Sequence, residues 1–513
     1  MRIPFGACGD SGPMRRGKGM GKGHRQFVSR HRQLSWSGMF VAFVLHLVLA
    51  PHLCNAETGR FLWLSDLHYD IFYSQADAWE TRGMSCSSDS APSEGQVECD
   101  APLSLIQNTL RAAKDALPSP DFILVTGDIS RHGMDRLPTA ETTLTDIFNQ
   151  IGHVFRSVFP RTSIVWCLGN NDAIADYYLD VDDPKVLRMA MDSNLKSFMA
   201  KSEVETFRRG GYFSRPMRNN VKMIALNTVM YSVNHQPRYS GDDPLGQFEW
   251  LRKKLERIKA EGGHVMIASH IPPAIGSYRH SQFWQERYLK QYLALVDEYS
   301  DTITAQLFGH LHSDEFRLLP LQSQNASPIL LTSSVTPIFG GNPSFRIVEY
   351  GNANGEVQNF QTYYLDLNGG GSNATWQQLY NFQEAYGVEN MTTQTMRSIV
   401  DSIAANGDEM GVFLTNQRVG APQPPCDANC ARDWGCVLTA ATSREYNNCA
   451  RALWYQRMVD TGGHRLMLAI SACILAALVI TAFLSLAYRQ RRRRKQYDDI
   501  AQDFNISDEL SLT

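Results

Sequence analysis

The sequence lacks several features that would assign it to a class of protein at once. It contains no internal repeat and no long low-complexity tract, so nothing indicates a repeat array or a disordered chain. It contains no CxxC pair, which argues against a zinc site made of cysteines. Residues 57–464 carry 34 Lys and Arg against 46 Asp and Glu. This acidic balance argues against nucleic acid as the main partner of the body of the chain.

Basic residues gather instead at the start of the chain. Residues 1–33 carry eight Lys and Arg and one acidic residue, and an apolar run follows at 39–50. Cys54, Asn55 and Ala56 then form a small-residue cleavage site. We therefore predict a basic leader and signal peptide at 1–56, with an uncleaved signal anchor as the alternative.

A second apolar stretch lies near the other end. Residues 466–488 are 23 residues without a charge, and "RQRRRRK" follows directly. The length predicts a transmembrane helix, and the basic cluster predicts a cytosolic tail at 489–513. The body then lies outside the cytosol, so the chain is predicted to be a single-pass type I membrane protein. Its predicted location is the lumen of an acidic compartment such as a lysosome or vacuole, or the cell exterior.

The cysteines fit an oxidising compartment. Four close together before the membrane predict two disulfides, with a zinc site as the alternative; they are Cys426, Cys430, Cys436 and Cys449. Cys86 and Cys99 flank a Ser/Gly-rich loop and are predicted to close it, whereas Cys167 lies in an apolar run and is predicted to be a buried free thiol. Three sequons predict glycosylation on the same side; they start at Asn325, Asn373 and Asn390.

The body alternates apolar runs with helical patterns, which predicts an α/β layered fold. Uninterrupted runs suit strands buried on both faces; they are "RFLWLSD", "DFILVTGD", "SIVWCLGN", "VKMIALN", "HVMIASH" and "ITAQLFGH". The helices are expected at 103–116, 141–156, 186–207, 246–260 and 282–298. Further strand-like runs follow residue 328, and then come helices, the Pro/Gly-rich boundary "RVGAPQPPC" and the cysteine cluster.

Five of these strand-like runs end in residue types that can bind metals. The residues are Asp66, His68, Asp128, Asn170, His270, His310 and His312. Because open α/β sheets place their sites at the carboxyl ends of strands, these side chains are expected to meet. Carboxylates and neutral imidazoles suit zinc, manganese or iron, and an amide oxygen can complete a shell. The pattern predicts a two-metal centre of the kind that activates water against phosphorus.

The order DxH, GDxxxH, GNxD, SH, GHxH resembles the calcineurin-like metallophosphoesterase superfamily. Longer segments resemble its acid sphingomyelinase-like phosphodiesterases more closely, and the likeness covers most of 60–450. These segments are "CDAP", "GGYFS", "LNT", "DDPLGQFEWL", "HIPP", "TITAQLFGHLHSDEF", "NPSFR" and the cysteine cluster. The resemblance implies an αββα sandwich at 57–366 with a two-metal site at the strand ends, and a helical, cysteine-containing subdomain at 367–465.

The resemblance also implies roles for the site residues. One cation, expected to be zinc, would be held by Asp66, His68, Asp128 and His312. The other would be held by Asp128, Asn170, His270 and His310, with Asp128 as the bridge.

The family usually has histidine after the ligand asparagine, where this chain has Asn171. An amide can contact phosphate but cannot act as a general acid, so the acid role passes to His132, with a loop histidine of no consequence as the alternative. Arg131 is predicted to contact phosphate, with an exposed arginine as the alternative. Asp172 is expected to form the turn or to support the ligands.

The "GNND" sequence is also similar to that of endopolyphosphatases, which have asparagine at this position. Phosphate is a good leaving group, so its departure depends less on a proton donor. The sequence therefore predicts a metal-dependent phosphohydrolase, acting on phosphodiesters or on polyphosphate. The competing hypothesis is a non-catalytic membrane receptor that has kept the fold. In the tail, Tyr497–Ile500 matches a tyrosine-based sorting signal for an adaptor, with a plain solvated tail as the alternative.

Overall fold

The computed structural model describes residues 58–73, 94–370, 374–460 and 463–509. The predicted signal peptide or anchor, Cys86 and the sequon asparagine at 373 lie outside the described residues. Cys99 is disulfide-bonded. Cys167 is a buried free thiol, as predicted.

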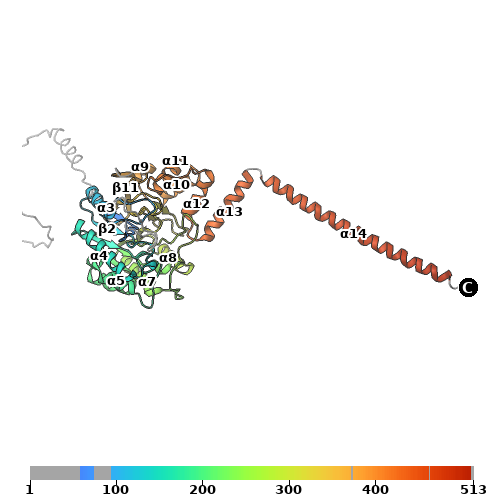
Figure 1. Ribbon diagram of the computed structural model, residues 1–513. Coiled ribbons are helices and arrows are strands. Elements are labelled where there is room, and N and C mark those ends of the chain that lie inside the picture. The colour runs from blue at the N-terminus through green and yellow to red at the C-terminus, as the bar shows by residue number, and fades with distance from the viewer. Residues whose placement is uncertain (1–57, 74–93, 371–373, 461–462, 510–513) are drawn as a thin grey trace, which may run out of the picture. The chain divides into compact units, whose positions relative to one another are not determined.

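Two six-stranded sheets form the centre of the fold (Figure 1). The first has the order β12-β11-β10-β1-β2-β3 and the second the order β4-β5-β6-β7-β9-β8. The strands are β1 Thr58–Leu64, β2 Phe122–Val125, β3 Ser163–Trp166, β4 Phe213–Pro216, β5 Val221–Ala225, β6 His264–Ala268, β7 Ile303–Phe308, β8 Glu315–Arg317, β9 Ile329–Leu331, β10 Ser344–Gly351, β11 Val357–Leu365 and β12 Trp376–Asn381.

The six strands expected from the uninterrupted apolar runs lie in the parallel part of each sheet. β1, β2 and β3 pair in parallel, and so do β5, β6 and β7. Their residues are almost all buried, because parallel strands are covered on both faces. One continuous hydrophobic core joins side chains from both sheets. Parallel pairing brings the carboxyl ends of neighbouring strands together, which is where the metal-binding side chains follow.

Helices cover the sheets, with α3 against β10 and α7 against β6. The predicted α/β layered fold is therefore confirmed. The helices of this part are α3 Leu103–Ala116, α4 Ala140–Val158, α5 Lys185–Asp192, α6 Lys201–Gly210, α7 Gln247–Ala260 and α8 Glu286–Glu298, and the short 3₁₀ helices are η1 Met134–Arg136, η2 Asn194–Phe198, η3 Val229–Tyr231 and η4 Pro244–Gly246.

The prediction of one helix at 186–207 was wrong. The segment forms α5, η2 and α6 in succession. Ser193 has extended backbone at the end of α5, and its hydroxyl accepts a hydrogen bond from Leu195 N. A serine that bonds the nearby backbone in this way competes with the helical hydrogen bonds and ends the helix. The apolar spacing continues across the break, so periodicity alone could not show it.

The first sheet extends beyond residue 366, where the helical subdomain was expected to begin. β12 pairs antiparallel with β11. Helices follow, namely α9 Phe382–Tyr386, α10 Thr393–Ala404, α11 Asp408–Gln417, α12 Ala428–Thr439 and α13 Ser443–Asp460. Cys426 bonds Cys430, and Cys436 bonds Cys449. The prediction of two disulfides is confirmed, and the alternative of a zinc site on these four cysteines is excluded because their sulfurs are paired.

The last element is α14, Gly463–Glu509 (Figure 1). It contains the predicted transmembrane segment and continues past it on both sides. The stretch Leu468–Gln496 is long and apolar enough to cross a membrane by length and composition. Its side chains are exposed in the isolated chain.

The end of α11 contacts two loops that follow strands of the sheets. Gln417 O accepts a hydrogen bond from Asp314 N at 3.0 Å, and Gln417 Nε2 donates to Glu315 Oε1 at 2.8 Å. Arg418 Nη2 donates to Phe339 O at 3.0 Å. The C-terminal helices are thus joined to the segments 310–315 and 336–341, which lie at the candidate site.

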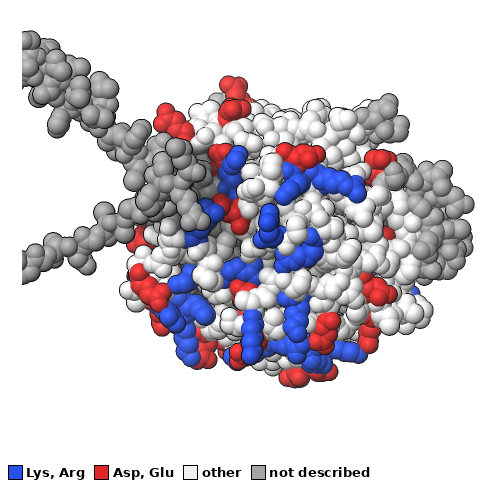
Figure 2. Space-filling view, turned by 90° about the vertical axis from the view of Figure 1, so that its left-hand side faces the viewer, with Lys and Arg blue, Asp and Glu red and all other residues white. Residues whose placement is uncertain are grey.

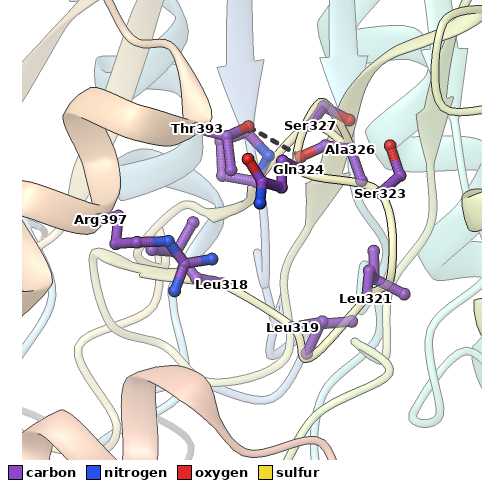
Figure 3. Close-up of a pocket in the computed structure, with 10 residues that line it drawn as sticks. Leu318, Leu319, Leu321, Ser323, Gln324, Ala326, Ser327, Thr393 and Arg397 are labelled. Carbon is purple, nitrogen blue, oxygen red and sulfur yellow. Dashed lines mark hydrogen bonds between the residues drawn. The ribbon is translucent and has the colours of Figure 1, made fainter.

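One face shows many Lys and Arg side chains with Asp and Glu between them (Figure 2). Exposed ion pairs such as Lys185–Glu141, which joins α5 to α4, contribute little to stability. A small pocket lies between α10 and segment 318–328, where Thr393 Oγ1 donates to Ala326 O at 2.8 Å (Figure 3). It has no acidic, histidine or cysteine side chain in its lining, so it offers no metal site.

Candidate metal centre

The structure brings all seven predicted metal-binding side chains together just beyond five parallel strands. Five of the seven have left-handed backbone; they are Asp66, His68, Asp128, His310 and His312, with φ between 41° and 75°. Non-glycine residues rarely adopt this conformation, and such strain gathers at functional sites. The turns are also crowded, since a Cβ at Gly169 would lie 2.0 Å from Asp128 Oδ1. Only glycine fits there.

Asp66, His68 and His312 form the first group. His312 Nε2 lies 3.2 Å from Asp66 Oδ1 and 3.2 Å from His68 Nε2. His68 and Asp66 are fully buried. The three ligand atoms come from segments after β1 and β7, which belong to different sheets.

Asp128, His270 and His310 form the second group. His270 Nε2 lies 3.2 Å from Asp128 Oδ2 and 3.3 Å from His310 Nδ1. Asn170 joins this group, because its Oδ1 lies 3.0 Å from the same His270 nitrogen. The members follow β2, β3, β6 and β7.

Asp128 lies between the two groups. Its Oδ2 is 3.4 Å from His68 Nε2 and 3.2 Å from His270 Nε2. One carboxylate oxygen thus faces an imidazole of each group, which is the arrangement expected of a residue that bridges two cations.

The donor set fits a pair of divalent cations. Asp66 Oδ1 is buried without a hydrogen-bond partner among the described residues. His68 Nε2 faces His312 Nε2, and His270 Nε2 faces His310 Nδ1, so ring nitrogens of neighbouring histidines are turned toward one another. A buried oxygen left over and nitrogens turned inward are what a cation would satisfy.

The protonation states of several candidate ligands also favour metal binding. Burial and the neighbouring His132 lower the pKa of His68 to about 3. Burial and His270 likewise lower the pKa of His310 to about 3. Burial alone would raise the pKa of Asp66, but His312 and His270 lower it below its usual range. At neutral pH His68 and His310 are therefore neutral and Asp66 is ionised, the forms that bind metals. Burial alone would lower the pKa of His270, but Asp128 and Asp66 raise it to about 9, so a cation bound there would displace a proton from this ring.

Backbone carbonyls orient the histidines. His68 Nδ1 lies 3.0 Å from Ser130 O, and His270 Nδ1 lies 2.7 Å from Thr126 O. Since a carbonyl oxygen can only accept, each Nδ1 carries a proton, and each Nε2 faces the cluster, where it offers a lone pair when the ring is neutral. This is the outer contact typical of metal-binding histidine.

Asn171 and Asp172 both support the loops that carry the ligands. Asn171 donates from N to Asp128 Oδ1 at 2.7 Å and from Nδ2 to Asp128 Oδ2 at 2.9 Å. Asp172 is fully buried and accepts from Ile129 N, Ser130 N and Gly169 N at 2.7–3.0 Å. It therefore fastens the loop after β2 to the loop after β3. Burial and the nearby Asp128 raise the pKa of Asp172 to about 7.

His132 lies against the first group. Its ring stacks on His68 with centroids 4.0 Å apart. Its Nδ1 lies 2.9 Å from Asp100 Oδ1, and Asp100 Oδ2 accepts from His132 N at 2.8 Å. Burial alone would lower the pKa of His132, but Asp100 raises it above its usual value. The sequence pattern did not reveal this role of Asp100, since Asp100 follows Cys99 and not a strand.

Arg131 does not lie on the surface. Its side chain is fully buried, its Nε lies 3.2 Å from Asp70 Oδ1, and its guanidinium covers the ring of Phe72. The alternative of an exposed arginine is wrong. An arginine buried against a carboxylate holds the loop together, and contact between Arg131 and phosphate stays a prediction.

Comparison with known proteins agrees with this geometry. The sequence model of the calcineurin-like phosphoesterase family matches residues 59–314, the part that carries every residue of both groups. The chain belongs to the calcineurin-like phosphoesterases. The fold is the mixed α/β metallophosphoesterase fold of this family, as the sequence predicted.

Three relatives of this calcineurin-like phosphoesterase match along most of their length. Acid sphingomyelinase-like phosphodiesterase 3b of Homo sapiens is 27% identical over 418 residues, which cover 78% of this chain and 91% of the relative. Sphingomyelinase phosphodiesterase D of Dictyostelium discoideum is 24% identical over 444 residues, covering 80% and 98%. Cyclic GMP-AMP phosphodiesterase SMPDL3A of Rattus norvegicus is 25% identical over 433 residues, covering 79% and 95%.

Proposed function

We propose that this protein hydrolyses phosphodiesters with two divalent cations held by the cluster. The observation that carries the proposal is the convergence of seven metal-binding side chains in two groups with Asp128 between them. A complete set of ligands also argues against the non-catalytic receptor. Zinc suits ligand sets made mainly of imidazoles and carboxylates, and manganese or iron is compatible with them.

Each residue of the site then has a role. Asp66, His68, Asp128 and His312 would hold one cation, and Asp128, Asn170, His270 and His310 the other. When bound, the cations supply an activated water and neutralise phosphate oxygens during in-line displacement at phosphorus. His132, held by Asp100, gives a proton to the leaving oxygen. Asn171 keeps Asp128 in place through its two hydrogen bonds.

The test uses the full-length protein in detergent. We expect about two zinc, manganese or iron ions per chain by elemental analysis, and hydrolysis of bis(4-nitrophenyl) phosphate. Removal of the ions with a chelator should abolish hydrolysis, and their return should restore it. A protein that purifies without such ions and gains no activity from them would contradict the proposal.

A second candidate function is cleavage of inorganic polyphosphate. Asn171 favours it, because an amide at this position cannot donate a proton to a leaving alkoxide. Phosphate leaves without that help. The names of the relatives, which act on phosphodiesters, favour the first candidate.

The Asn171→His variant separates the two substrate classes. A histidine here would add a second proton donor, so hydrolysis of esters with poor leaving groups should rise about tenfold or more. Cleavage of polyphosphate should change little. Asn171→Ala is the control, because it removes the amide without adding an acid. Equal changes for both substrates in the histidine variant would contradict this role of position 171.

We further propose that α14 anchors the catalytic body outside the cytosol, in the lumen of an acidic compartment or at the cell surface. The apolar stretch Leu468–Gln496 and the basic residues that end it support this orientation. The two disulfides fit an oxidising compartment. Asn325 and Asn390 are exposed, so both sequons are accessible to glycosylation. Tyr497–Ile500 would then face cytosolic sorting adaptors.

A further inference from the structure

Phe339 is a large apolar side chain that the fold leaves in solvent beside the metal centre. It is 57% exposed. Among the described residues before α14, only Tyr178 and Tyr278 are other exposed large hydrophobic side chains. Single exposed hydrophobic residues are common and need no explanation. The surroundings of Phe339 distinguish it.

The ring of Phe339 lies against two histidines of the site. Its centroid is 4.7 Å from that of His312 and 5.6 Å from that of His132. His132 in turn stacks on His68 with an angle of 14° between the rings. Flat rings thus line one side of the metal centre, and Phe339 is the outermost of them.

The backbone around Phe339 holds the ring in this position. Thr336 N donates to Asp66 O at 3.1 Å, and Glu98 N donates to Pro337 O at 3.1 Å. Beyond the ring, Arg418 Nη2 donates to Phe339 O. The ring is therefore presented to solvent by a fixed turn that is bonded directly to a predicted metal ligand. A platform that is fixed before binding loses little entropy when a ligand covers it.

We propose that Phe339 is a specificity residue, on which the planar base of a nucleoside phosphodiester stacks while its phosphate lies at the metal centre. The inference rests on the function proposed above and names its substrate class. Every nucleobase has a π-face, so one phenyl ring serves all of them. Polyphosphate has no planar group and gains nothing from the ring. A quaternary ammonium group could also cover an aromatic face, and the experiment separates that case.

The experiment measures binding and not turnover. The full-length protein, loaded with zinc in detergent, is titrated in a calorimeter with AMP, ribose 5-phosphate and phosphocholine. AMP and ribose 5-phosphate share the sugar and phosphate and differ by the base. We expect AMP to bind more tightly than ribose 5-phosphate. Phe339→Leu, which stays apolar but loses the aromatic face, should weaken AMP about tenfold and leave ribose 5-phosphate unchanged.

Two further variants sharpen the test. Phe339→Trp should keep the affinity for AMP, because it restores a flat ring. Tyr278→Leu should change nothing, since this exposed aromatic ring contacts Arg279 and has no ring contact with the site histidines.

Three results would overturn the assignment of Phe339. They are equal affinities of the wild type for AMP and ribose 5-phosphate, equal losses for both ligands in Phe339→Leu, and a loss confined to phosphocholine. In each of them a phosphate ligand still binds, so the proposed function survives. If none of the three ligands binds the zinc-loaded protein, both proposals fail.

Discussion

The Asp128→Asn variant is expected to hydrolyse bis(4-nitrophenyl) phosphate more than about 100-fold more slowly than the wild type. Even mutation of residues that only support metal ligands lowers activity or metal affinity by about 10- to 100-fold. Asp128 Oδ2 faces both His68 and His270, so its loss affects both cation positions at once. Asparagine keeps the shape of the side chain but removes the negative charge. The bound metal should fall from about two ions per chain to one or none, as measured by elemental analysis.

The control is Asp135→Asn, which makes the same chemical change at an exposed position seven residues further on. It should keep both ions and its activity. Circular dichroism should show that both variants are folded. If Asp128→Asn kept two ions per chain and full activity, Asp128 would not be the bridge and the proposed centre would be wrong.

The His132→Gln variant is expected to reveal a general acid through its choice of substrate. Glutamine can make a hydrogen bond but cannot donate a proton to a departing alkoxide. Loss of general acid catalysis costs about 10²- to 10⁴-fold when the leaving group needs the proton. Diesters with an alkyl leaving group should therefore suffer a loss of that size, whereas diesters that release 4-nitrophenol should change little. The measurement is the slope of log kcat/KM against the pKa of the leaving group, which should become steeper.

Two further variants test this interpretation. Asp100→Asn should steepen the same slope to a lesser degree. Asp100 accepts hydrogen bonds from His132 N and His132 Nδ1, and these two bonds fix the position of the imidazole ring. His153→Gln, at an exposed position of α4, should leave the slope unchanged. A uniform loss across all leaving groups in His132→Gln would instead indicate that His132 only supports His68, on which its ring stacks.

The convergence of the seven candidate ligands could be predicted because of how parallel strands behave. A strand covered on both faces shows as an uninterrupted apolar run, and the polar residues just after it must lie at the carboxyl edge of the sheet. All seven predicted ligands follow such strands, and the structure brings all of them together. The path that the chain takes between the strands did not have to be known.

Other features depend on contacts that no local pattern records. Asp100 follows no predicted strand, and Phe339 lies in the loop after β9 without being a metal-ligand type, so only the packing of distant segments shows that both lie against His132. β12 has only one buried residue in six, so it showed no apolar run. Asp172 was expected to form a turn or support the ligands. Its three hydrogen bonds join the loops after β2 and β3, so it supports the ligands. This role depends on the pairing of β2 with β3.

If α14 anchors the body to a membrane as proposed, the hydrogen bonds made by Gln417 and Arg418 limit where an active fragment could be cut free. Both residues lie on the C-terminal side of the sheets, and they hold the loops that carry His312 and Phe339. A protease that cut before Gln417 would release a body in which these two loops had lost the hydrogen bonds from Gln417 and Arg418. The disulfide Cys436–Cys449 extends the required portion further. Shedding of a working enzyme would therefore have to occur in the short stem between Cys449 and Leu468.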